Sequence, residues 1–247
     1  MASRSNSVPA EHELLCEHCG YGLNGLPTVG LCPECGEPVA DSTTADGRGL
    51  PPWERPELSG LARLVQTTSG VVFSPRQFFR RMLARAHPRR SRVFAMVQHW
   101  LAAYFFSIAI VIHLLFVAGG RWDVVTSVFI GLLGGTALTP FLFAAIAFTT
   151  WLVSKLSTLE SRYHGFRLPA ATVTRALHYH AAHLLPVSMF TAAIVATYRI
   201  LLATDSLPRG DSELPYLITL CAWVVISAAY LFWTYWLAMR NLVYANR

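Results

Sequence analysis

The stretch "VFAMVQHWLAAYFFSIAIVIHLLFVAGG", residues 93–120, contains 28 residues without a formal charge. A helix of about 20 apolar residues is long enough to cross the hydrocarbon core of a bilayer. Three further uncharged runs follow, with 31 residues after Asp123, 23 after Arg175 and 26 after Glu213. The chain is therefore predicted to be an all-α polytopic membrane bundle.

The four uncharged runs predict spans near residues 94–118, 124–153, 184–204 and 215–239. The second run is longer than a straight crossing requires, and it contains Pro140. A proline inside a helix removes a backbone hydrogen bond and kinks or breaks the helix. A kink leaves four spans, whereas a break would divide this run into two crossings and give five.

The distribution of arginine and lysine favours four spans. Basic residues gather before the first span, between the second and third spans, and after the fourth, whereas the other two loops contain only Arg121 and Arg209. Cytoplasmic loops carry an excess of basic residues. Four spans place all three basic segments in the cytoplasm, so we expect both the N-terminus and the C-terminus there. The first fifteen residues also lack the apolar core of a signal peptide.

The composition excludes an ordinary soluble domain. The chain is 53% hydrophobic and 14% charged, whereas about a quarter of the residues in a soluble domain are charged. The net charge is +6, and seven arginines with no acid lie between residues 76 and 92. A basic cluster binds either nucleic acid or an anionic surface. Its position beside an apolar run favours the lipid bilayer as partner and disfavours nucleic acid.

Four of the five cysteines form two Cys-x-x-Cys pairs near the N-terminus, and a glycine follows each pair. Two intervening residues let a tight turn bring both sulfurs of a pair to one ion, at about 2.3 Å for zinc. In a reducing compartment such pairs hold metal more often than they form disulfides. The pattern predicts a small zinc ribbon over residues 1–36 with one structural Zn²⁺ ion, whose ligands are Cys16, Cys19, Cys32 and Cys35.

A redox pair and a rubredoxin-type iron site are the alternatives to zinc. A redox site requires one reactive pair near a βαβ pattern, which this sequence lacks. Four thiolates close the coordination sphere and leave no open position for catalysis. Since the sequence also contains no nucleotide-binding glycine loop and no nucleophile–base set, no catalytic residues are predicted and the chain is expected not to be an enzyme.

Between the ribbon and the bundle, residues 37–60 are rich in Pro, Gly, Ser and Thr and are predicted to form a flexible linker. Residues 61–93 are predicted to contain an amphipathic interfacial helix, followed by the bundle over residues 94–247. We expect the apolar side chains of this helix to enter the headgroup region and its arginines to meet phosphates. The predicted interface residues are Phe78, Phe79, Arg80, Arg81, Met82, Leu83 and Arg85. The alternative is a helix packed on a protein core with a solvated basic face.

Three motifs together resemble bacterial membrane proteins of the Yip-domain (Ypt-interacting-protein) family. They are "CPECG" (32–36), "VVFSPRQFFRRM" (71–82) and "YHGFRLPAATVTRALHYHAAHLLP" (163–186). The resemblance covers about residues 70–240 and implies a polytopic helical protein of the bacterial cytoplasmic (inner) membrane, without catalytic residues. Members of this family usually have five spans, so the count of four departs from the family pattern.

Further candidates have a structural interpretation. The three histidines of "HYHAAH" (178–183) do not converge on one side of a helix, so we expect them to be packed or interfacial rather than metal ligands. Arg199 lies near the predicted outer end of the third span, where its side chain can reach the headgroups. Gly131 and Gly135 are expected to let helices pack closely.

Three functions fit these observations. The first is a non-enzymatic integral membrane adaptor or membrane-organising protein, whose cytosolic zinc ribbon recruits a protein partner. The second is a small-solute or ion permease regulated by the ribbon, which the absence of an acid within any span disfavours. The third is a membrane-tethered nucleic-acid binder, and the absence of Lys and Arg between Cys16 and Cys35 disfavours it.

Overall fold

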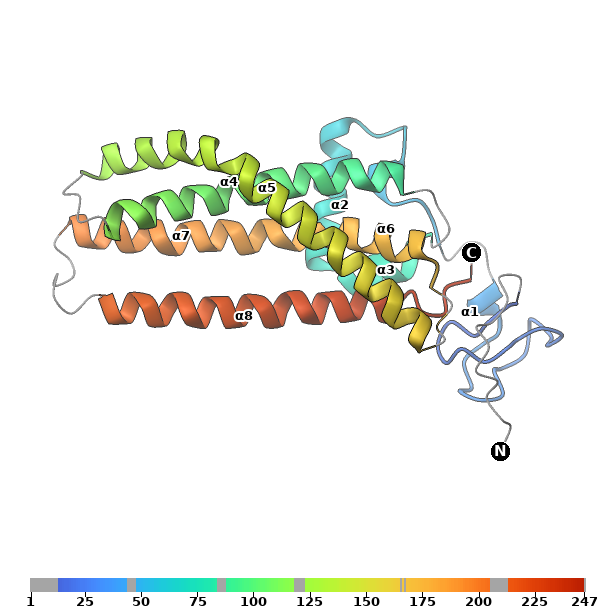
Figure 1. Cartoon of the computed structure of the whole chain (residues 1–247). Helices are drawn as coiled ribbons and strands as arrows, with labels where there is room; N and C mark the ends of the chain where they lie inside the picture. The colour runs from blue at the N-terminus through green and yellow to red at the C-terminus, as the bar shows by residue number, and fades with distance from the viewer. Residues whose placement is uncertain are drawn as a thin grey trace. The chain divides into compact units, whose positions relative to one another are not determined.

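The computed structural model describes residues 13–43, 48–83, 88–117, 123–164, 166, 168–204 and 213–246. Its helices, shown in Figure 1, are α1 (Ala40–Thr43), the 3-10 turn η2 (Pro52–Glu54), α2 (Gly60–Phe73), α3 (Pro75–Arg81), α4 (Arg89–Val117), α5 (Val124–Tyr163), α6 (Ala170–His180), the 3-10 turn η3 (Ala181–His183), α7 (Leu184–Ala203) and α8 (Glu213–Arg240). The stretches long and apolar enough to cross a bilayer are Arg89–Leu115, Val125–Tyr163, Ala170–Leu202 and Leu214–Arg240. In the described ranges, extended segments pair only as isolated bridges. The predicted all-α bundle with four long apolar helices is therefore confirmed.

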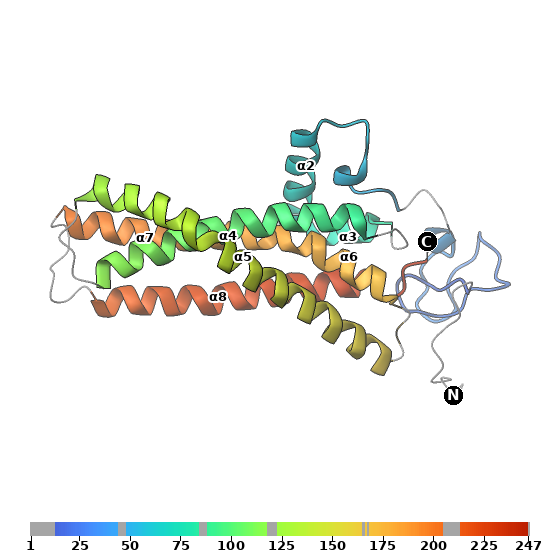
Figure 2. The same cartoon turned by 45° about the horizontal axis from the view of Figure 1, so that its top comes forward.

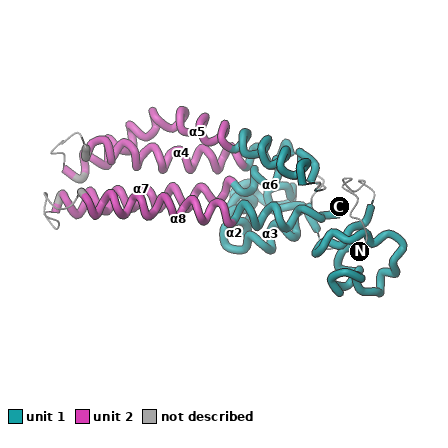
Figure 3. The backbone as a smooth tube through the Cα atoms, turned by 60° about the horizontal axis from the view of Figure 1, so that its bottom comes forward, with its two compact units in different colours: residues 1–94, 150–180, 234–247 teal, residues 95–149, 181–233 magenta. Residues whose placement is uncertain are grey.

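The chain divides into two compact units, which Figure 3 shows in different colours. Unit 1 contains Met1–Phe94, Thr150–His180 and Thr234–Arg247, and unit 2 contains Ala95–Thr149 and Ala181–Trp233. The boundaries fall within long helices, so α4, α5 and α8 each contribute to both units.

Unit 2 carries large apolar side chains on its outside and small polar ones between its helices. Phe141 is 74% exposed and Phe232 is 69% exposed, whereas Ser107, Thr139 and Ser188 are buried. In water an apolar surface of this kind would promote aggregation. In a bilayer, acyl chains cover the apolar side chains, and small residues let the helices approach each other. The distribution is that of a bundle surrounded by lipid.

Gly131 and Gly135 lie against α4 within unit 2. A Cβ atom at Gly131 would lie 2.9 Å from Cγ1 of Ile112, and one at Gly135 would lie 3.0 Å from Cγ1 of Ile108. Both distances are shorter than normal van der Waals contact, so a larger side chain would push α4 and α5 apart. The predicted use of this Gly-x-x-x-Gly motif in internal packing is confirmed.

Helix α5 continues through Pro140 without interruption. The break that a fifth span would need is therefore not seen. With 40 residues the helix also extends past residue 153, the predicted end of the second span. At about 1.5 Å per residue it is roughly 60 Å long, about twice the thickness of the hydrocarbon core. Part of α5 therefore lies outside the hydrocarbon or crosses it at a large tilt.

A buried ion pair joins η2 to α6 in unit 1. Oε1 of Glu54 accepts hydrogen bonds from Nε and Nη2 of Arg175, at 3.1 and 2.8 Å, and from the hydroxyl group of Tyr179. Nη1 of Arg175 donates to the carbonyl oxygen of Leu83. All three side chains are buried, and the ring of Phe94 packs on Tyr179. Because an unpaired charge in this place would be strongly destabilising, the ion pair fixes η2 against α6.

Residues 48–60 are folded against other parts of unit 1, so the prediction of a flexible linker over residues 37–60 is wrong for this part. Arg48 donates from Nη1 to two carbonyl oxygens at the end of α3. The indole N–H of Trp53 donates to the carbonyl oxygen of Arg90 at 2.8 Å. The composition of the segment indicates only that it has no regular periodicity. A few large side chains hold it in place.

The apolar face of α3 points into unit 1. Phe79 and Met82 are fully buried, at 0% and 1% exposure. The ring of Phe78 packs edge-on against Phe79 and Tyr179, with centroid distances of 5.3 and 5.4 Å. Phe79 and Met82 therefore lie in the protein core and do not enter the headgroup region. This corrects the prediction for these two residues, because an apolar arc on a helix fits a protein core as well as a lipid boundary.

Candidate metal centre

Two short turns of the same design present the four cysteines. In the first turn, the N–H of Gly20 donates to the carbonyl oxygen of Cys16 at 2.8 Å. In the second turn, the N–H of Gly36 donates to the carbonyl oxygen of Cys32 at 2.9 Å. Gly20 and Gly36 have φ angles of 82° and 74°, in the left-handed region that favours glycine. Each glycine therefore completes the turn that contains its pair of cysteines.

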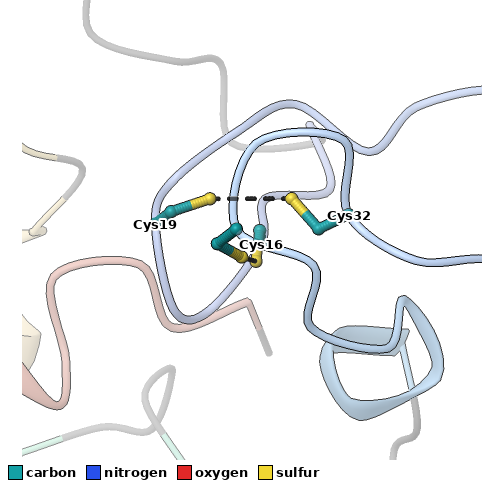
Figure 4. A group of neighbouring side chains, drawn as sticks. Cys16, Cys19 and Cys32 are labelled. Atoms are coloured by element: carbon teal, nitrogen blue, oxygen red, sulfur yellow. Dashed lines mark hydrogen bonds between the residues drawn. The ribbon is translucent and has the colours of Figure 1, made fainter.

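The four sulfur atoms form a compact cluster, and Figure 4 shows Cys19 and Cys32 pointing toward each other. All four lie within 4.8 Å of one another. The Sγ–Sγ distance is 3.6 Å from Cys16 to Cys35 and also from Cys19 to Cys32. Tetrahedral coordination with metal–sulfur distances of about 2.3 Å requires sulfur atoms about 3.8 Å apart. The four cysteines could therefore hold a tetrahedral metal ion with little movement.

A small apolar core surrounds the sulfur atoms. Leu23 and Val39 are buried together with two of the cysteines, and Leu14 and Leu26 pack against them. So few side chains cannot stabilise a fold by burial alone. We therefore expect metal binding and folding of this segment to be coupled. Residues 13–43 are called the cysteine module below.

The environments of the thiols differ. Burial raises the pKa of Cys19. At Cys32 burial opposes ionisation, but the backbone N–H groups of Cys35 and Glu34 outweigh it and lower the pKa to about 7. The lowered pKa favours the thiolate form of Cys32, which is the form that binds a metal ion.

The C-terminal tail packs on the cysteine module within unit 1. Nδ2 of Asn246 donates to the carbonyl oxygens of Leu15 and Ser42, at 2.8 and 2.9 Å, and its Oδ1 accepts from the N–H of Leu15 at 2.9 Å. The ring of Tyr244 lies so close to Gly20 that a Cβ atom there would be 2.5 Å from the ring. The C-terminal tail is therefore folded against the cysteine module.

A salt bridge between Glu17 and Arg48 extends this contact. The closest oxygen and nitrogen atoms are 2.8 Å apart, and the Arg48 side chain is 7% exposed. Arg48 also donates to the carbonyl oxygen of Asn241 at 3.2 Å, and Glu17 accepts from the N–H of Asn246 at 3.1 Å. Arg48 thus forms hydrogen bonds with the cysteine module, with the end of α3 and with the residue after α8.

Of the four remaining predicted interface residues, the structure describes three. Arg80 and Arg81 are exposed on α3, and Leu83 is half-buried just after it. Arg85 lies outside the described residues. An interfacial role for the exposed arginines stays a prediction.

The three histidines of residues 178–183 have the packed role that was expected. Nδ1 of His178, Nε2 of His180 and Nδ1 of His183 each lie near a different hydroxyl oxygen. Those hydroxyl groups belong, in the same order, to Ser91 at 2.9 Å, Thr234 at 2.9 Å and Tyr230 at 2.6 Å.

Several polar residues attach the cysteine module and the segment after it to the rest of unit 1, and no sequence pattern predicts them. These residues are Glu17, Arg48, Glu54, Arg175 and Asn246. Each is an isolated polar residue without periodic spacing, and its partner lies far away in the sequence.

Comparison with protein-family models, with curated proteins and with solved structures finds no match for this chain. The resemblance to Yip-domain proteins therefore stays a prediction.

Proposed function

We propose that this protein is a non-enzymatic integral membrane adaptor, in which a zinc-bound cysteine module recruits a protein partner. Zinc is the proposed ion because four thiolates around a closed tetrahedron are typical of structural zinc sites. The proposal rests on the different roles of the residues in the cysteine module. Some of these residues attach the module to the C-terminal tail, while others form an exposed apolar and acidic surface.

The exposed surface of the module suits a partner with apolar and basic side chains. Val29 is 97% exposed and Leu31 is 65% exposed. Glu34, Glu37 and Asp41 are also exposed, and residues 5–47 contain no Lys or Arg. Apolar anchors surrounded by charges of one sign give a partner both affinity and orientation.

The contact between Asn246 and Leu15 supports an even number of membrane crossings. Both residues have to be on the same side of the membrane for their hydrogen bonds to form. The excess of arginine before the first span and after the fourth points to the cytoplasmic side. We therefore propose four spans with both termini in the cytoplasm of a bacterial cell.

A permease remains the second candidate, because unit 2 contains polar side chains between its helices. Several of these side chains hydrogen-bond one another: Nδ1 of His113 lies 2.7 Å from the hydroxyl oxygen of Tyr216, and Trp223 donates to Thr191 at 2.9 Å. Such pairs also stabilise helix packing. A proton or cation pathway normally contains a carboxylate within the membrane. Among the described residues of unit 2, the acids lie only at the beginnings of α5 and α8.

Nucleic acid is the third candidate. The acidic surface of the cysteine module would repel phosphates, which speaks against this function.

Site-specific photo-crosslinking in native membranes tests the adaptor function. A photoreactive amino acid at Val29 is expected to give a discrete adduct with one cytosolic protein. The additional substitution Leu31→Ser should reduce the yield severalfold, whereas Thr28→Ala, at a neighbouring exposed position, should leave it unchanged. The absence of any protein adduct, or an adduct that survives Cys32→Ser unchanged, would contradict recruitment through a metal-held surface.

A further inference from the structure

The outer face of α2 is apolar. Leu61 is 73% exposed, Val65 is 56% exposed and Phe73 is 82% exposed, while Thr67 and Val71 face the interior of unit 1. At about 100° per residue, the three exposed apolar side chains lie within an arc of about 120° on the helix. One face of α2 packs on the protein, and the other exposes apolar side chains. Burial of this second face in a partner would be favourable.

From the start of α2 through α3, the charged residues are all arginines. Arg63 is the one charged residue within the helix, and residues 58–92 contain eight arginines and no acid. Arg76, Arg80 and Arg81 are exposed on α3, which follows α2 directly. An uncharged apolar face next to a cluster of arginines is typical of a helix that lies on an anionic membrane surface.

The orientation of α2 agrees with such a position. Figure 2 shows α2 running across the direction in which the first turns of α4 extend. Within unit 1, α2 packs closely on its neighbours, since a Cβ atom at Gly70 would lie 3.4 Å from the ring of Phe78 and Val71 is buried. A spanning helix is usually tilted by only about 20° from the bilayer normal. A helix that lies across the beginning of α4 therefore runs along the membrane surface when α4 spans the bilayer.

We propose that α2 is an interfacial helix whose partner is the anionic lipid surface. Leu61, Val65 and Phe73 insert at the headgroup boundary, and the exposed arginines of α3 bind lipid phosphates. This assigns the apolar insertion to α2, because the apolar side chains of α3 are directed into the protein. The proposal concerns attachment to the membrane and is independent of which partner the cysteine module recruits.

The test uses the full-length chain reconstituted in vesicles of phosphatidylcholine, with or without phosphatidylglycerol. A photoreactive amino acid replaces Leu61, Val65 or Phe73, and lipid adducts are measured by mass spectrometry. Val29, which is also apolar and exposed but lies in the cysteine module, is the control position. All three positions on α2 are expected to form lipid adducts, in higher yield in the anionic vesicles, and Val29 is not. Metal content and a single monodisperse species show that each variant is folded.

A second pair of variants tests the role of the charges. Arg80→Gln together with Arg81→Gln should lower the adduct yield by roughly tenfold in anionic vesicles, because each arginine is attracted to the surface potential, and should have little effect in neutral ones. Arg162→Gln, at an exposed arginine of α5, is the control and should change neither yield. The proposal would be overturned if the α2 positions gave no lipid adducts, if they crosslinked to protein instead, or if yields were independent of lipid charge and of both arginines.

Discussion

The side chain of Asn246 satisfies both backbone groups of Leu15, donating to the carbonyl oxygen at 2.8 Å and accepting from the N–H at 2.9 Å. Leu15 also forms an isolated bridge with Gly22, just after the first Cys-x-x-Cys turn. A residue next to the C-terminus thus completes the hydrogen bonding of a segment that holds a candidate metal ligand. The tail is part of the fold of the cysteine module.

Replacing Asn246 by Ala should loosen the module locally. Leu15 and Ser42 would lose buried hydrogen bonds, at about 1–3 kcal/mol for groups left unsatisfied. Hydrogen exchange of the Leu15 amide should accelerate by roughly 10- to 100-fold, while one metal ion stays bound. Asn24→Ala is the matched control, because Asn24 accepts an exposed hydrogen bond from the N–H of Leu14 within the same module. This substitution should change the free energy of unfolding by less than about 0.5 kcal/mol. Equal effects of the two substitutions would argue against a structural role of the tail.

The metal site predicts a stoichiometry and a pH dependence. The purified full-length protein should contain one zinc ion per chain, and Cys32→Ser should remove it, because three thiolates and a hydroxyl bind zinc less tightly than four thiolates. Affinity for zinc should fall as the pH falls, since protons compete for the thiolates. Cys221→Ser is the control, because Cys221 is exposed on α8 and should not affect metal content. Elemental analysis at several pH values measures these effects, and a pH-independent affinity would contradict thiolate ligation.

The sequence predicts some of these features much better than others. Four uncharged runs and two Cys-x-x-Cys pairs are local signals, since bilayer thickness sets the length of a span and coordination geometry sets the spacing of ligands. Phe79 shows where a local signal is ambiguous, because amphipathicity does not say whether protein or lipid covers the apolar face. The partners of Arg48 could not be predicted, because they come from segments up to 193 residues away. Such contacts produce no periodic pattern in the sequence.

The ion pair of Glu54 and Arg175 should be sensitive to removal of one charge. Glu54→Gln leaves the Arg175 guanidinium buried without its counter-charge, and we expect a loss of about 3–5 kcal/mol in the free energy of unfolding. Replacing both residues, as Glu54→Leu with Arg175→Met, should recover most of this loss because no buried charge remains. Glu57→Gln at a nearby exposed acid should have little effect. Thermal unfolding of the detergent-solubilised protein measures all three, and a double variant no better than Glu54→Gln would contradict this explanation.

The close packing of α4 and α5 should not tolerate a larger residue at Gly135. A leucine there would overlap Ile108, whose backbone nitrogen would lie 3.4 Å from the new Cβ atom. Overpacking of this kind destabilises a protein by about 1–3 kcal/mol or more. Ala137→Leu, at an exposed position of the same helix, adds similar bulk toward lipid and should be tolerated. The melting temperatures of the two variants in detergent distinguish the outcomes, and similar values would mean that α4 and α5 do not pack through Gly135.

The most direct test of this account is a crosslink between the two ends of the chain in intact membranes. A photoreactive amino acid in place of Tyr244 is expected to crosslink intramolecularly to a peptide of the cysteine module that contains Gly20, the residue its ring contacts. A chelator should reduce the yield, because loss of the metal unfolds the module. This result would place both ends of the chain on one side of a membrane crossed an even number of times. Adducts from position 244 to lipid or to other proteins, without any to the module, would contradict the account.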